Sequence, residues 1–565
     1  MKVVGINYLS ESSVALIENG KLKYAISQER LNRIKNWWGN PFLAIEFLLK
    51  ETGNKIEDID YFATHGLSAL TKNIPNEIYF KKKINIVRCS NLAKKAKDKQ
   101  IKFLNMRYDH EIKVNKRTLN NLKNLKKKFK NLYVYDHHKS HAASAYFYSG
   151  WKDCYVLTID GWGDNSSSKF YYANNGFLKE LNRTNTIDSL GYFYGSITDL
   201  LGFKPHRHEG KVLGLAAFGN PKIAYSVISK MISYDSNSKS FVGNFEKGYF
   251  ISKFNNPNLQ FMKKKFKREN IAAAAQKRIE DVIIEFIKDN VPIKSKIALA
   301  GGVFSNVKIN QKISELKNIK DVFIFPNMGD GGLAVGSASL CYNEKSKFKF
   351  KLQNLEQVYL GPKYSTLKVL SAIKKYNFKY FVHSNPEKFI ASELHDGKVV
   401  ACFHGKMEFG PRSLGNRSIL VRAIDKSVND WLNKKLRRTE FMPFAPITLE
   451  KEAPKMYYGL KKKKISTKFM TITCNCTRKA INLFPAAIHV DKTARPQIIN
   501  KKINSKIYKL LSEYFKISKI PTLINTSFNV HEEPIVCSPE DAMRAFLKSK
   551  LDYLYIEDYI VYKKL

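Results

Sequence analysis

Two stretches in the N-terminal half repeat one pattern of apolar and polar positions. Residues 2–25 read KVVGINYLSESSVALIENGKLKYA, and residues 155–180 read YVLTIDGWGDNSSSKFYYANNGFLKE. Each begins with an apolar run that ends in a polar residue, Asn7 or Asp160, and continues through a turn with two serines, a second apolar run and an Asn-Gly turn. Apolar runs separated by such turns predict β-strands. We therefore predict two three-stranded meanders, and their similarity indicates a duplicated α/β domain.

Helical patterns fill much of the remaining N-terminal half. A Lys-rich stretch at about 70–130 is predicted to be helical. The segment 271–287 carries its apolar residues at helical spacing. It predicts a helix with a buried face made of Ile279, Val282, Ile283 and Phe286.

A charged segment without periodicity, 343–357, suggests a domain boundary. We predict one domain over 1–345 and a second, smaller α/β domain over 358–565. A duplicated α/β domain is the design of the superfamily of sugar kinases, actin and Hsp70, in which nucleotide binds in the cleft between the two halves. The predicted fold class is therefore α/β, with an actin-like first domain.

Composition limits the classes of function. With 44% hydrophobic and 13% aromatic residues, the 565-residue chain can form packed cores. The first residues do not resemble a signal peptide, and no run approaches the length of a membrane span, so we expect a cytoplasmic protein. The formal net charge of +46 makes nucleic acid a possible partner. However, the lysines are spread along the whole chain and no nucleic-acid-reading motif is present, so solvated surface lysines are the plainer interpretation.

A pair of histidines suggests a metal site. His137 and His141 are four residues apart in DHHKSHAASAYFYSG, so on a helix both imidazoles face one side. Such a pair can chelate a metal, although an ordinary surface pair has the same spacing. Asp160 at a strand end and Asp330 beside Gly-rich backbone are candidate carboxylate ligands. Two imidazoles and two carboxylates suit Fe²⁺, Mn²⁺ or Zn²⁺.

Gly-rich turns follow several predicted strands, in TIDGWGDNSSS, LAGGVFSN and NMGDGGLAVG. Free N–H groups at such turns can hold phosphate, although each alone could be a tight turn. In HRHEGKVLGLAAFGNP, Glu209 and Lys211 flank a glycine, and this loop could face a ribose or simply begin a helix. We predict a nucleotide site lined by Gly161, Gly163, Asp164, Glu209, Lys211, Gly301, Gly302, Asn306, Gly331 and Gly332.

Three arginines stand in Gly- or Pro-containing loops of the second half. They are Arg412 in KMEFGPRSLGNRSI, Arg438 in RRTEFMPFAP and Arg495 in HVDKTARPQ. Guanidinium groups in such loops suit a small phosphorylated or carboxylated ligand, although each alone would more often be a surface residue. We predict an anion site in the second domain.

Together these strings resemble the O-carbamoyltransferase family that modifies antibiotics and nodulation factors. The matching strings run from the start to near the end of the chain and are DHHKSHAASA, DGWGD, SLGYFY, HEGKVLGLAAFG, AGGVFSNV, KMEFGPRSLGNRSI, FMPFAP, HVDKTARPQ and NTSFN followed by EEPIV. The resemblance implies an actin-like N-terminal domain with iron, similar to tRNA threonylcarbamoyl-transferases. It also implies a C-terminal domain similar to threonylcarbamoyl-AMP synthases.

The same resemblance implies the chemistry. In that family carbamoyl phosphate loses its phosphate, the carbamate reacts with ATP to give carbamoyl-adenylate and pyrophosphate, and the carbamoyl group passes to an acceptor hydroxyl. A sugar, glycan or natural product is the implied acceptor. The implied metal ligands are His137, His141, Asp160 and Asp330. The implied residues for carbamoyl phosphate are Arg412, Arg438 and Arg495, with Ser527 and Asn529 nearby.

One departure from the family leaves the general base open. The family opens with G-I-N-x-x-H-D-x-S-A, whereas this chain has Ser10 in place of the histidine and Glu11 in place of the aspartate. Serine cannot act as a base near neutral pH. Either Glu11 serves as the catalytic base, or the metal supports the step, or the activity is altered.

Two other classes of function stay open. One is a tRNA threonylcarbamoyl-transferase-like, nucleic-acid-modifying protein, which the charge and shared fold favour and the C-terminal strings FMPFAP and HVDKTARPQ oppose. The other is a non-catalytic ATP-binding protein, and its only support is the presence of Ser10 in place of the family's histidine. The sequence does not identify the acceptor.

Overall fold

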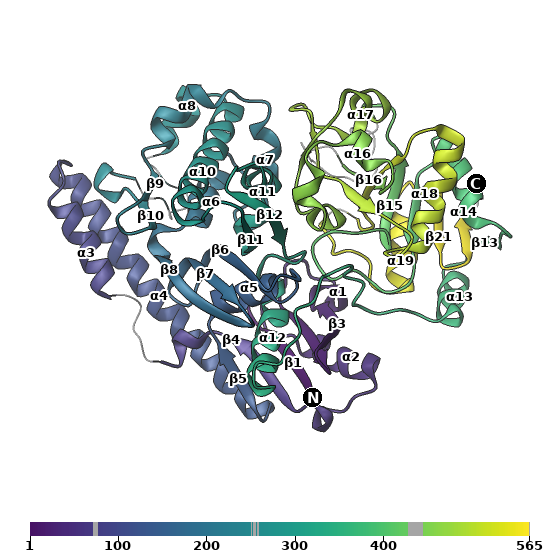
Figure 1. Cartoon of the computed structure of the whole chain (residues 1–565), viewed down its shortest axis with the longest axis horizontal. Coiled ribbons are helices and arrows are strands. Elements are labelled where there is room, and N and C mark those ends of the chain that lie inside the picture. The colour runs from purple at the N-terminus through teal and green to yellow at the C-terminus, as the bar shows by residue number, and fades with distance from the viewer. Residues whose placement is uncertain are drawn as a thin grey trace. The chain divides into compact units, whose positions relative to one another are not determined.

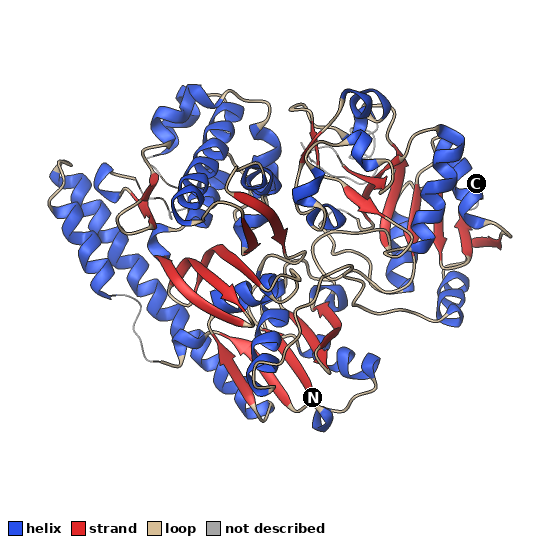
Figure 2. Cartoon of the chain, in the orientation of Figure 1, coloured by secondary structure: helices blue, strands red, loops and turns tan. Residues whose placement is uncertain are grey.

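The computed structural model describes residues 1–71, 77–249, 251, 256, 259–427, 444–530 and 532–563. These residues form a mixed α/β fold with several sheets (Figures 1 and 2). Arg438 lies outside the described residues. Across the described part of the chain, no helix is both long and apolar enough to cross a membrane.

The chain folds into two compact units. The first comprises Met1–Tyr8, Ile17–Lys21 and Glu57–Asn354, and the second comprises Leu9–Leu16, Leu22–Ile56 and Leu355–Leu565. The N-terminal meander therefore contributes residues to both units. The predicted domain bounds, 1–345 and 358–565, stay a prediction.

The first five-stranded sheet contains the N-terminal meander. Its order is β3-β2-β1-β4-β5, and β1, β4 and β5 run parallel. The strands are β1 (Lys2–Asn7), β2 (Ser13–Glu18), β3 (Lys21–Ser27), β4 (Tyr61–His65) and β5 (Leu132–Tyr135). The β2–β3 turn forms at Asn19 and Gly20, whose φ angles of 49° and 73° suit a tight hairpin between twisted strands. The predicted first meander is confirmed.

The second five-stranded sheet repeats this order as β8-β7-β6-β11-β12. Its strands are β6 (Asp153–Gly163), β7 (Ser166–Asn174), β8 (Phe177–Asn185), β11 (Ser295–Ala300) and β12 (Ile319–Ile324). The strands β6, β7 and β8 are antiparallel, whereas β6, β11 and β12 are parallel. Asn175 and Gly176 repeat the tight turn, with φ angles of 50° and 85°. The second meander is confirmed. In each sheet the first strand of the meander pairs in parallel with a further strand, and that strand pairs in parallel with the last one.

Helices and a short hairpin complete the first unit. The elements are α3 (Glu77–Arg88), α4 (Lys94–Lys128), α5 (His137–Tyr146), α6 (Leu190–Leu200), α7 (Glu209–Ala216), α8 (Pro221–Ile228), β9 (Ile232–Asp235), β10 (Ser240–Gly243), α9 (Gln260–Lys265), α10 (Arg268–Asn290), α11 (Val307–Ser314) and α12 (Leu333–Lys345). The Lys-rich stretch is helical as predicted, in α3 and α4. The predicted helix 271–287 lies within α10, and its predicted apolar face is buried.

Small residues let α12 approach its neighbours closely. This helix packs against β1, β4 and α5. A side chain at Gly336 would place its Cβ 1.8 Å from the carbonyl oxygen of Ser140 in α5, and one at Gly5 would lie 1.8 Å from that of Ala334. Only glycine fits at either contact, so these positions set how closely α5 and β1 pack on α12.

The second unit is built on an eight-stranded mixed sheet, β13-β22-β21-β14-β15-β20-β16-β19. Its strands are β13 (Lys379–Val382), β14 (Val400–Phe403), β15 (Arg417–Arg422), β16 (Ala445–Leu449), β19 (Gln497–Ile499), β20 (Thr522–Ser527), β21 (Tyr553–Ile556) and β22 (Tyr559–Tyr562). A small pair is formed by β17 (Cys474–Asn475) and β18 (Thr493–Ala494). The helices are α1 (Glu29–Asn32), α2 (Phe42–Thr52), α13 (Thr366–Lys375), α14 (Pro386–His395), α16 (Ala453–Met456), α17 (Arg478–Leu483), α18 (Ser505–Ser518) and α19 (Pro539–Lys548). One apolar core surrounds the central strands β14, β15 and β20.

Candidate metal centre and substrate-binding residues

The two candidate histidine ligands lie one turn apart on α5. Asp136 caps this helix, because its Oδ1 accepts a hydrogen bond of 2.8 Å from the backbone N–H of Lys139. The other Asp136 oxygen accepts from Lys169 Nζ at 2.8 Å. His137 and His141 are both buried, with exposed fractions of 3% and 0%. The helix therefore presents both imidazoles within the protein and not on its surface.

The two carboxylates come from neighbouring parts of the second sheet. Asp160 lies in β6, and Asp330 begins a short 3₁₀ turn between β12 and α12. Because β6, β11 and β12 are parallel, segments that leave their carboxyl ends meet at one edge of the sheet. This topology brings together two residues that are 170 positions apart in the sequence.

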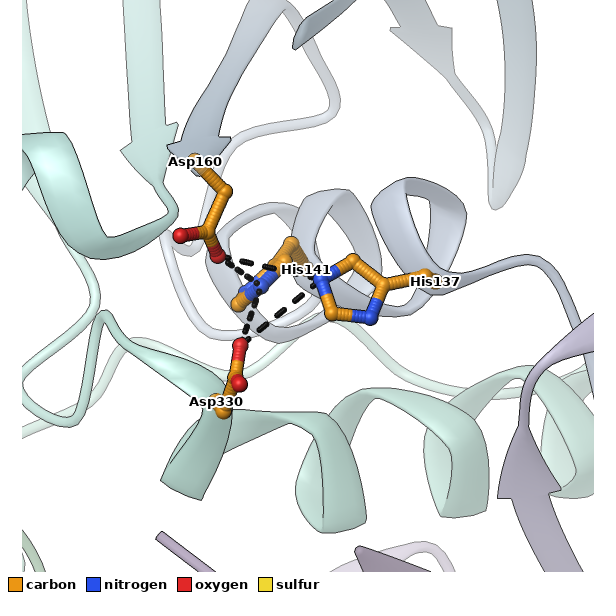
Figure 3. Close-up of side chains that lie close together, drawn as sticks. All are labelled: His137, His141, Asp160 and Asp330. Carbon is orange, nitrogen blue, oxygen red and sulfur yellow. Dashed lines mark hydrogen bonds and ion pairs between the residues drawn. The ribbon is translucent and has the colours of Figure 1, made fainter. Parts of the chain in front are cut away.

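The four side chains converge on one point (Figure 3). His141 Nε2 lies 3.1 Å from Asp160 Oδ2 and 3.5 Å from Asp330 Oδ1, and His137 Nε2 lies 3.7 Å from each of these oxygens. All four ligand atoms lie within 4.8 Å of one another. Bonds of about 2.1 Å around a first-row cation separate neighbouring ligands by roughly 3.0–3.4 Å. The arrangement fits such a cation after small movements.

Burial and mutual charge set the protonation of this group. Burial by itself would raise the pKa of Asp160, but the two neighbouring histidines hold it well below its usual range. Burial and the charge of Asp160 raise the pKa of Asp330. Burial opposes a charge on His141, yet hydrogen bonds to both carboxylates raise its pKa to about 9. A cation that binds here must displace the His141 proton, because a protonated imidazole has no free lone pair.

A second layer of contacts orients the ligands. His65 Nε2 lies 2.9 Å from Asn7 Oδ1, and Asn7 Nδ2 donates at 2.9 Å to the backbone oxygen of Asp330. The ring of His65 packs edge-on against that of His137. Asn7, which ends β1, and Asp160, which lies three residues before the end of β6, therefore both lie close to Asp330. Sequence reasoning did not identify His65, which no motif distinguishes.

The carboxylate of Asp164, a residue predicted to bind nucleotide, accepts hydrogen bonds from other parts of the protein. Its carboxylate accepts hydrogen bonds from the backbone N–H groups of Leu67, Ser68 and His137 and from the Ser68 hydroxyl, at 2.7–3.1 Å. Asp164 thus ties the loop after β4 to the start of α5. These contacts place Asp164 next to His137, a candidate metal ligand, and its predicted nucleotide role stays a prediction.

Six predicted glycines gather around the two carboxylates. Gly161 N–H donates to Asp160 Oδ1 at 2.7 Å. A Cβ on Gly163 would lie 2.1 Å from the His137 ring, and one on Gly302 would lie 3.0 Å from Asp160 Oδ1. The remaining three, Gly301, Gly331 and Gly332, pack against backbone or the Asn327 side chain at distances that leave no space for a Cβ. The Gly-rich loops are therefore close-packed around the candidate metal ligands.

The other predicted nucleotide residues begin helices. Asn306 caps α11 by accepting from Ile309 N–H at 3.2 Å, and it donates to Gln276 Oε1 at 2.8 Å. Glu209 is the first residue of α7 and accepts from His206 N–H at 2.7 Å. Lys211 lies two residues later in the same helix. The segments of Asn306 and Glu209 are therefore helix starts, as the sequence also allowed for the loop of Glu209. The predicted role of these residues in nucleotide binding stays a prediction.

In the second unit hydrogen bonds join the loop at Ser413–Leu414 to the strands β19 and β20, and predicted residues lie next to each of these segments. Asn525 Nδ2 donates to Gln497 Oε1 at 2.7 Å and to the Ser413 carbonyl at 3.2 Å. Gln497 Nε2 donates to the Leu414 carbonyl at 2.8 Å. Four predicted residues lie within a few positions of these groups in the sequence, namely Arg412, Arg495, Ser527 and Asn529. The Ser527 hydroxyl donates a hydrogen bond of 2.7 Å to Asn529 Oδ1. The network therefore joins the chain segments that carry Arg412, Arg495 and the Ser527–Asn529 pair, and a shared anion site stays a prediction.

Glu408 and Arg417 build the loop that carries Arg412. Glu408 Oε1 accepts from the N–H groups of Leu414, Asn416 and Arg417 at 2.7–3.2 Å. Arg417 is fully buried, with its guanidinium 3.6 Å from the centre of the Phe403 ring. Sequence reasoning missed both roles, because the string KMEFGPRSLGNRSI does not show which charged residues turn inward.

Glu11, the candidate base, lies in the turn between β1 and β2. Its φ of 51° falls in the left-handed region, which a non-glycine residue occupies at some energetic cost. Its catalytic role stays a prediction.

Comparison with known proteins identifies the family. A model described as carbamoyltransferase N-terminus matches residues 2–339, and one described as carbamoyltransferase C-terminus matches residues 391–563. The chain belongs to the carbamoyltransferase family. It is therefore a transferase enzyme, and the resemblance inferred from the motifs is confirmed.

Several relatives of this carbamoyltransferase match nearly its whole length. An uncharacterised protein of Methanocaldococcus jannaschii, MJ1058, is 33% identical over 100% of both chains. Nodulation protein NolNO of Sinorhizobium fredii is 28% identical over 99% of this chain and 79% of its own. Nodulation protein U of Rhizobium tropici is 24% identical over 94% and 91%. A solved structure of full-length HypF is 20% identical over 33% of this chain and 22% of its own, with a TM-score of 0.24, which is too low to support conclusions about the fold.

Proposed function

We propose that this carbamoyltransferase is a cytoplasmic O-carbamoyltransferase that uses carbamoyl phosphate and ATP. Carbamoyl phosphate and water give carbamate and phosphate. A carbamate oxygen then attacks the α-phosphorus of ATP, and pyrophosphate leaves. Finally, an acceptor hydroxyl attacks the carbamoyl carbon of the carbamoyl-adenylate, and AMP leaves. The observation that carries the proposal is the convergence of His137, His141, Asp160 and Asp330 in a chain of this family.

The two similar sheets support a nucleotide site in the first unit. Each consists of a meander followed by two parallel strands, which is the arrangement expected of an actin-like duplication. The segments that carry Asp160 and Asp330 lie toward the carboxyl ends of the parallel strands β6, β11 and β12, which is where parallel sheets commonly bind their ligands. We therefore assign ATP and the carbamoyl-adenylate to these loops.

The same four residues are proposed to hold a divalent cation, with Fe²⁺ as the first candidate. The two histidines are buried and the two carboxylates are partly exposed, and together they form a borderline donor set that suits iron. When bound, the cation supplies a Lewis acid for the carbamoyl oxygen. His65 and Asn7 would keep the ligands in place, as such outer contacts do in other metal sites.

Carbamoyl phosphate is assigned to the second unit, next to the hydrogen bonds that join Asn525, Gln497 and Ser413. Arg412 and Arg495 would hold the phosphate, since a dianion leaving water needs several cations. Ser527 and Asn529 lie next to the same network and would contact the carbamoyl end. Arg438 is a third candidate from its motif alone.

Glu11 is proposed as the general base for the acceptor hydroxyl, in place of the histidine that the family carries one position earlier. Its carboxylate is the only ionisable side chain between Asn7 and Ser13 apart from the Tyr8 hydroxyl. Burial raises the pKa of Tyr8 well above its usual value, which makes that hydroxyl a poor base near neutral pH.

Pyrophosphate release tests the first half of the reaction. The enzyme, reconstituted with Fe²⁺ under anaerobic conditions, should release pyrophosphate from ATP only when carbamoyl phosphate is present. Arg495→Ala should abolish this release, while Lys501→Ala, an exposed lysine nearby, should leave it unchanged. Near-normal release by Arg495→Ala would remove Arg495 from the site.

The acceptor class is tested by radiolabelled carbamoyl transfer. Sugars, glycans and unmodified tRNA would be offered separately with carbamoyl phosphate and ATP. Transfer to a sugar or glycan hydroxyl supports the proposal. Modification of tRNA alone would favour the nucleic-acid-modifying alternative.

A further inference from the structure

The helices α3 and α4 hold a disproportionate share of the positive charge of the chain. Together they contain seventeen lysines and arginines but only four aspartates and glutamates, which gives a net charge of +13. The whole chain of 565 residues carries +46, and the two helices are 12 and 35 residues long. The lysine excess is therefore concentrated on these helices beyond what the composition of the rest of the chain accounts for.

Both helices contact the rest of the first unit through the same short 3₁₀ turn, Thr186–Asp188. On α4, Glu111 accepts a hydrogen bond of 2.6 Å from the Thr186 hydroxyl. On α3, Lys83 Nζ lies 2.9 Å from Asp188 Oδ1. The two helices also pack against each other (Figure 1). Their opposite faces therefore point away from the unit, and we call this surface the α3–α4 face.

The exposed side chains of the α3–α4 face are mostly cationic. Fourteen of the seventeen basic side chains of the two helices are exposed, against three acidic ones. Lysines recur along α4 at spacings of four, three and eleven residues, which places them in one row on one side of a helix. This row consists of Lys95, Lys99, Lys102 and Lys113 and extends over about 27 Å at about 1.5 Å per residue.

Large apolar side chains are exposed among these lysines. Met106 lies four residues after Lys102, in the same row, and is 53% exposed. On α3, Ile78 is 85% exposed, and Lys81 and Lys82 follow it one turn later. A single exposed apolar residue is ordinary. Apolar side chains set within a lysine-rich helical face form the combination that anionic bilayers bind, because the cations contact the lipid headgroups while the apolar groups enter the interface.

We propose that the α3–α4 face binds the surface of an anionic lipid bilayer, so that the enzyme docks peripherally on a membrane. The attraction is between the excess of exposed cations on this face and the negative charge of the lipid headgroups. The inference is independent of the proposed function, because this binding needs neither ATP nor carbamoyl phosphate.

The residue types favour a bilayer over nucleic acid. Twelve of the fourteen exposed cations are lysines, which act as point charges, whereas arginine is the usual residue for recognising nucleic acids. The structure describes α3 and α4 completely, and none of the large apolar side chains exposed on them is aromatic. Unpaired bases would therefore find no exposed ring on which to stack.

Vesicle flotation tests the proposal without substrates. The full chain is mixed at about 0.1 M salt with phosphatidylcholine vesicles that contain either no anionic lipid or about 30% phosphatidylglycerol. We expect binding to the anionic vesicles only. Binding should be lost in about 1 M salt, because the screening length falls from about 10 Å to about 3 Å. An enzyme that does not bind the anionic vesicles, or binds both kinds equally, overturns the proposal.

A matched pair of variants shows whether binding uses the α3–α4 face or only the net charge. Each variant replaces four exposed lysines with glutamine, a good helix former, and circular dichroism confirms that both are folded. The test variant changes Lys95, Lys99, Lys102 and Lys113, and the control changes Lys388, Lys479, Lys501 and Lys502 of the second unit. A lysine near an anionic bilayer contributes about fivefold in affinity. The test variant should therefore bind about 10²-fold or more weakly and the control as the wild type does, whereas equal losses would overturn the proposal.

Met106 distinguishes a bilayer from nucleic acid, since only a bilayer offers an apolar interior. Met106→Ser should weaken vesicle binding by about three- to tenfold, as expected when part of an apolar side chain is no longer removed from water. Met106→Leu should bind as the wild type does, and neither variant should change binding to a short RNA duplex. An RNA duplex that binds the wild type more tightly than the anionic vesicles, and loses affinity in the four-lysine test variant, would assign the α3–α4 face to nucleic acid and overturn the proposal.

Discussion

The contact between Gly163 and His137 allows a sharp test of the metal centre. An added Cβ at Gly163 would lie 2.1 Å from Cδ2 of His137 and 2.6 Å from its Nε2. At Gly161, two residues earlier in the same strand, the nearest atom would be 3.9 Å away, which is an ordinary contact. Gly163→Ala and Gly161→Ala therefore make the same chemical change, but only the first should disturb a ligand.

The expected displacement follows from these distances. Relieving a 2.1 Å approach to the usual 3.4 Å or more requires the ring or the strand to move by about 1 Å. Metal–ligand bonds tolerate only about 0.2 Å. Gly163→Ala should therefore weaken cation binding at least about tenfold, the lower range for disturbing contacts around a metal ligand. Its cost in folding free energy should be about 1–3 kcal/mol, as for overpacking in general.

Metal content and affinity provide the assay. Both variants and the wild type are stripped with chelator and reconstituted anaerobically with Fe²⁺, and with Mn²⁺ for electron paramagnetic resonance. Circular dichroism confirms that each is folded. Equal metal content and affinity in Gly163→Ala and Gly161→Ala would refute the assignment of His137 as a ligand.

Three more predictions follow from the described contacts. Removing the cation with chelator should lower Tm and adding it back should restore it, because a ligand that binds only the folded state stabilises that state; a Tm indifferent to metal would contradict the site. Burial raises the pKa of Glu111 from 4.5 to about 7, so the folded protein binds this proton more tightly than the unfolded chain does. The stability that the protonated carboxyl contributes is therefore present below pH 4.5 and is lost as the pH rises to 7. Relative to wild type, Glu111→Gln should therefore gain up to about 3 kcal/mol in unfolding free energy between pH 4.5 and pH 8, measured with urea, and an equal difference at both pH values would exclude this titration. Glu11→Gln should spare pyrophosphate release and lower carbamoyl transfer by about 10²–10⁴, with partial rescue by Ser10→His, whereas a change in KM alone would remove Glu11 as the base.

Local patterning was sufficient for the parts of the protein whose geometry is set within a few residues. The two Asn-Gly turns specify hairpins wherever they occur, since both positions take positive φ. The four-residue spacing of His137 and His141 places both on one side of any helix. The meanders, the long helices and the histidine pair could therefore be predicted without knowledge of the packing.

Tertiary structure decided which polar groups are buried and which of them lie close together. Asp164 receives hydrogen bonds from two segments far from it in the sequence, and its predicted nucleotide role stays a prediction. Arg107 and Glu111 lie in a Lys-rich helix without any motif, and only packing against Tyr192 and Thr186 buries them. The approach of Asp330 to Asp160 depends on the parallel order of β6, β11 and β12. Such contacts join segments far apart in the chain, so their geometry depends on how whole sheets and helices pack, which no local pattern records.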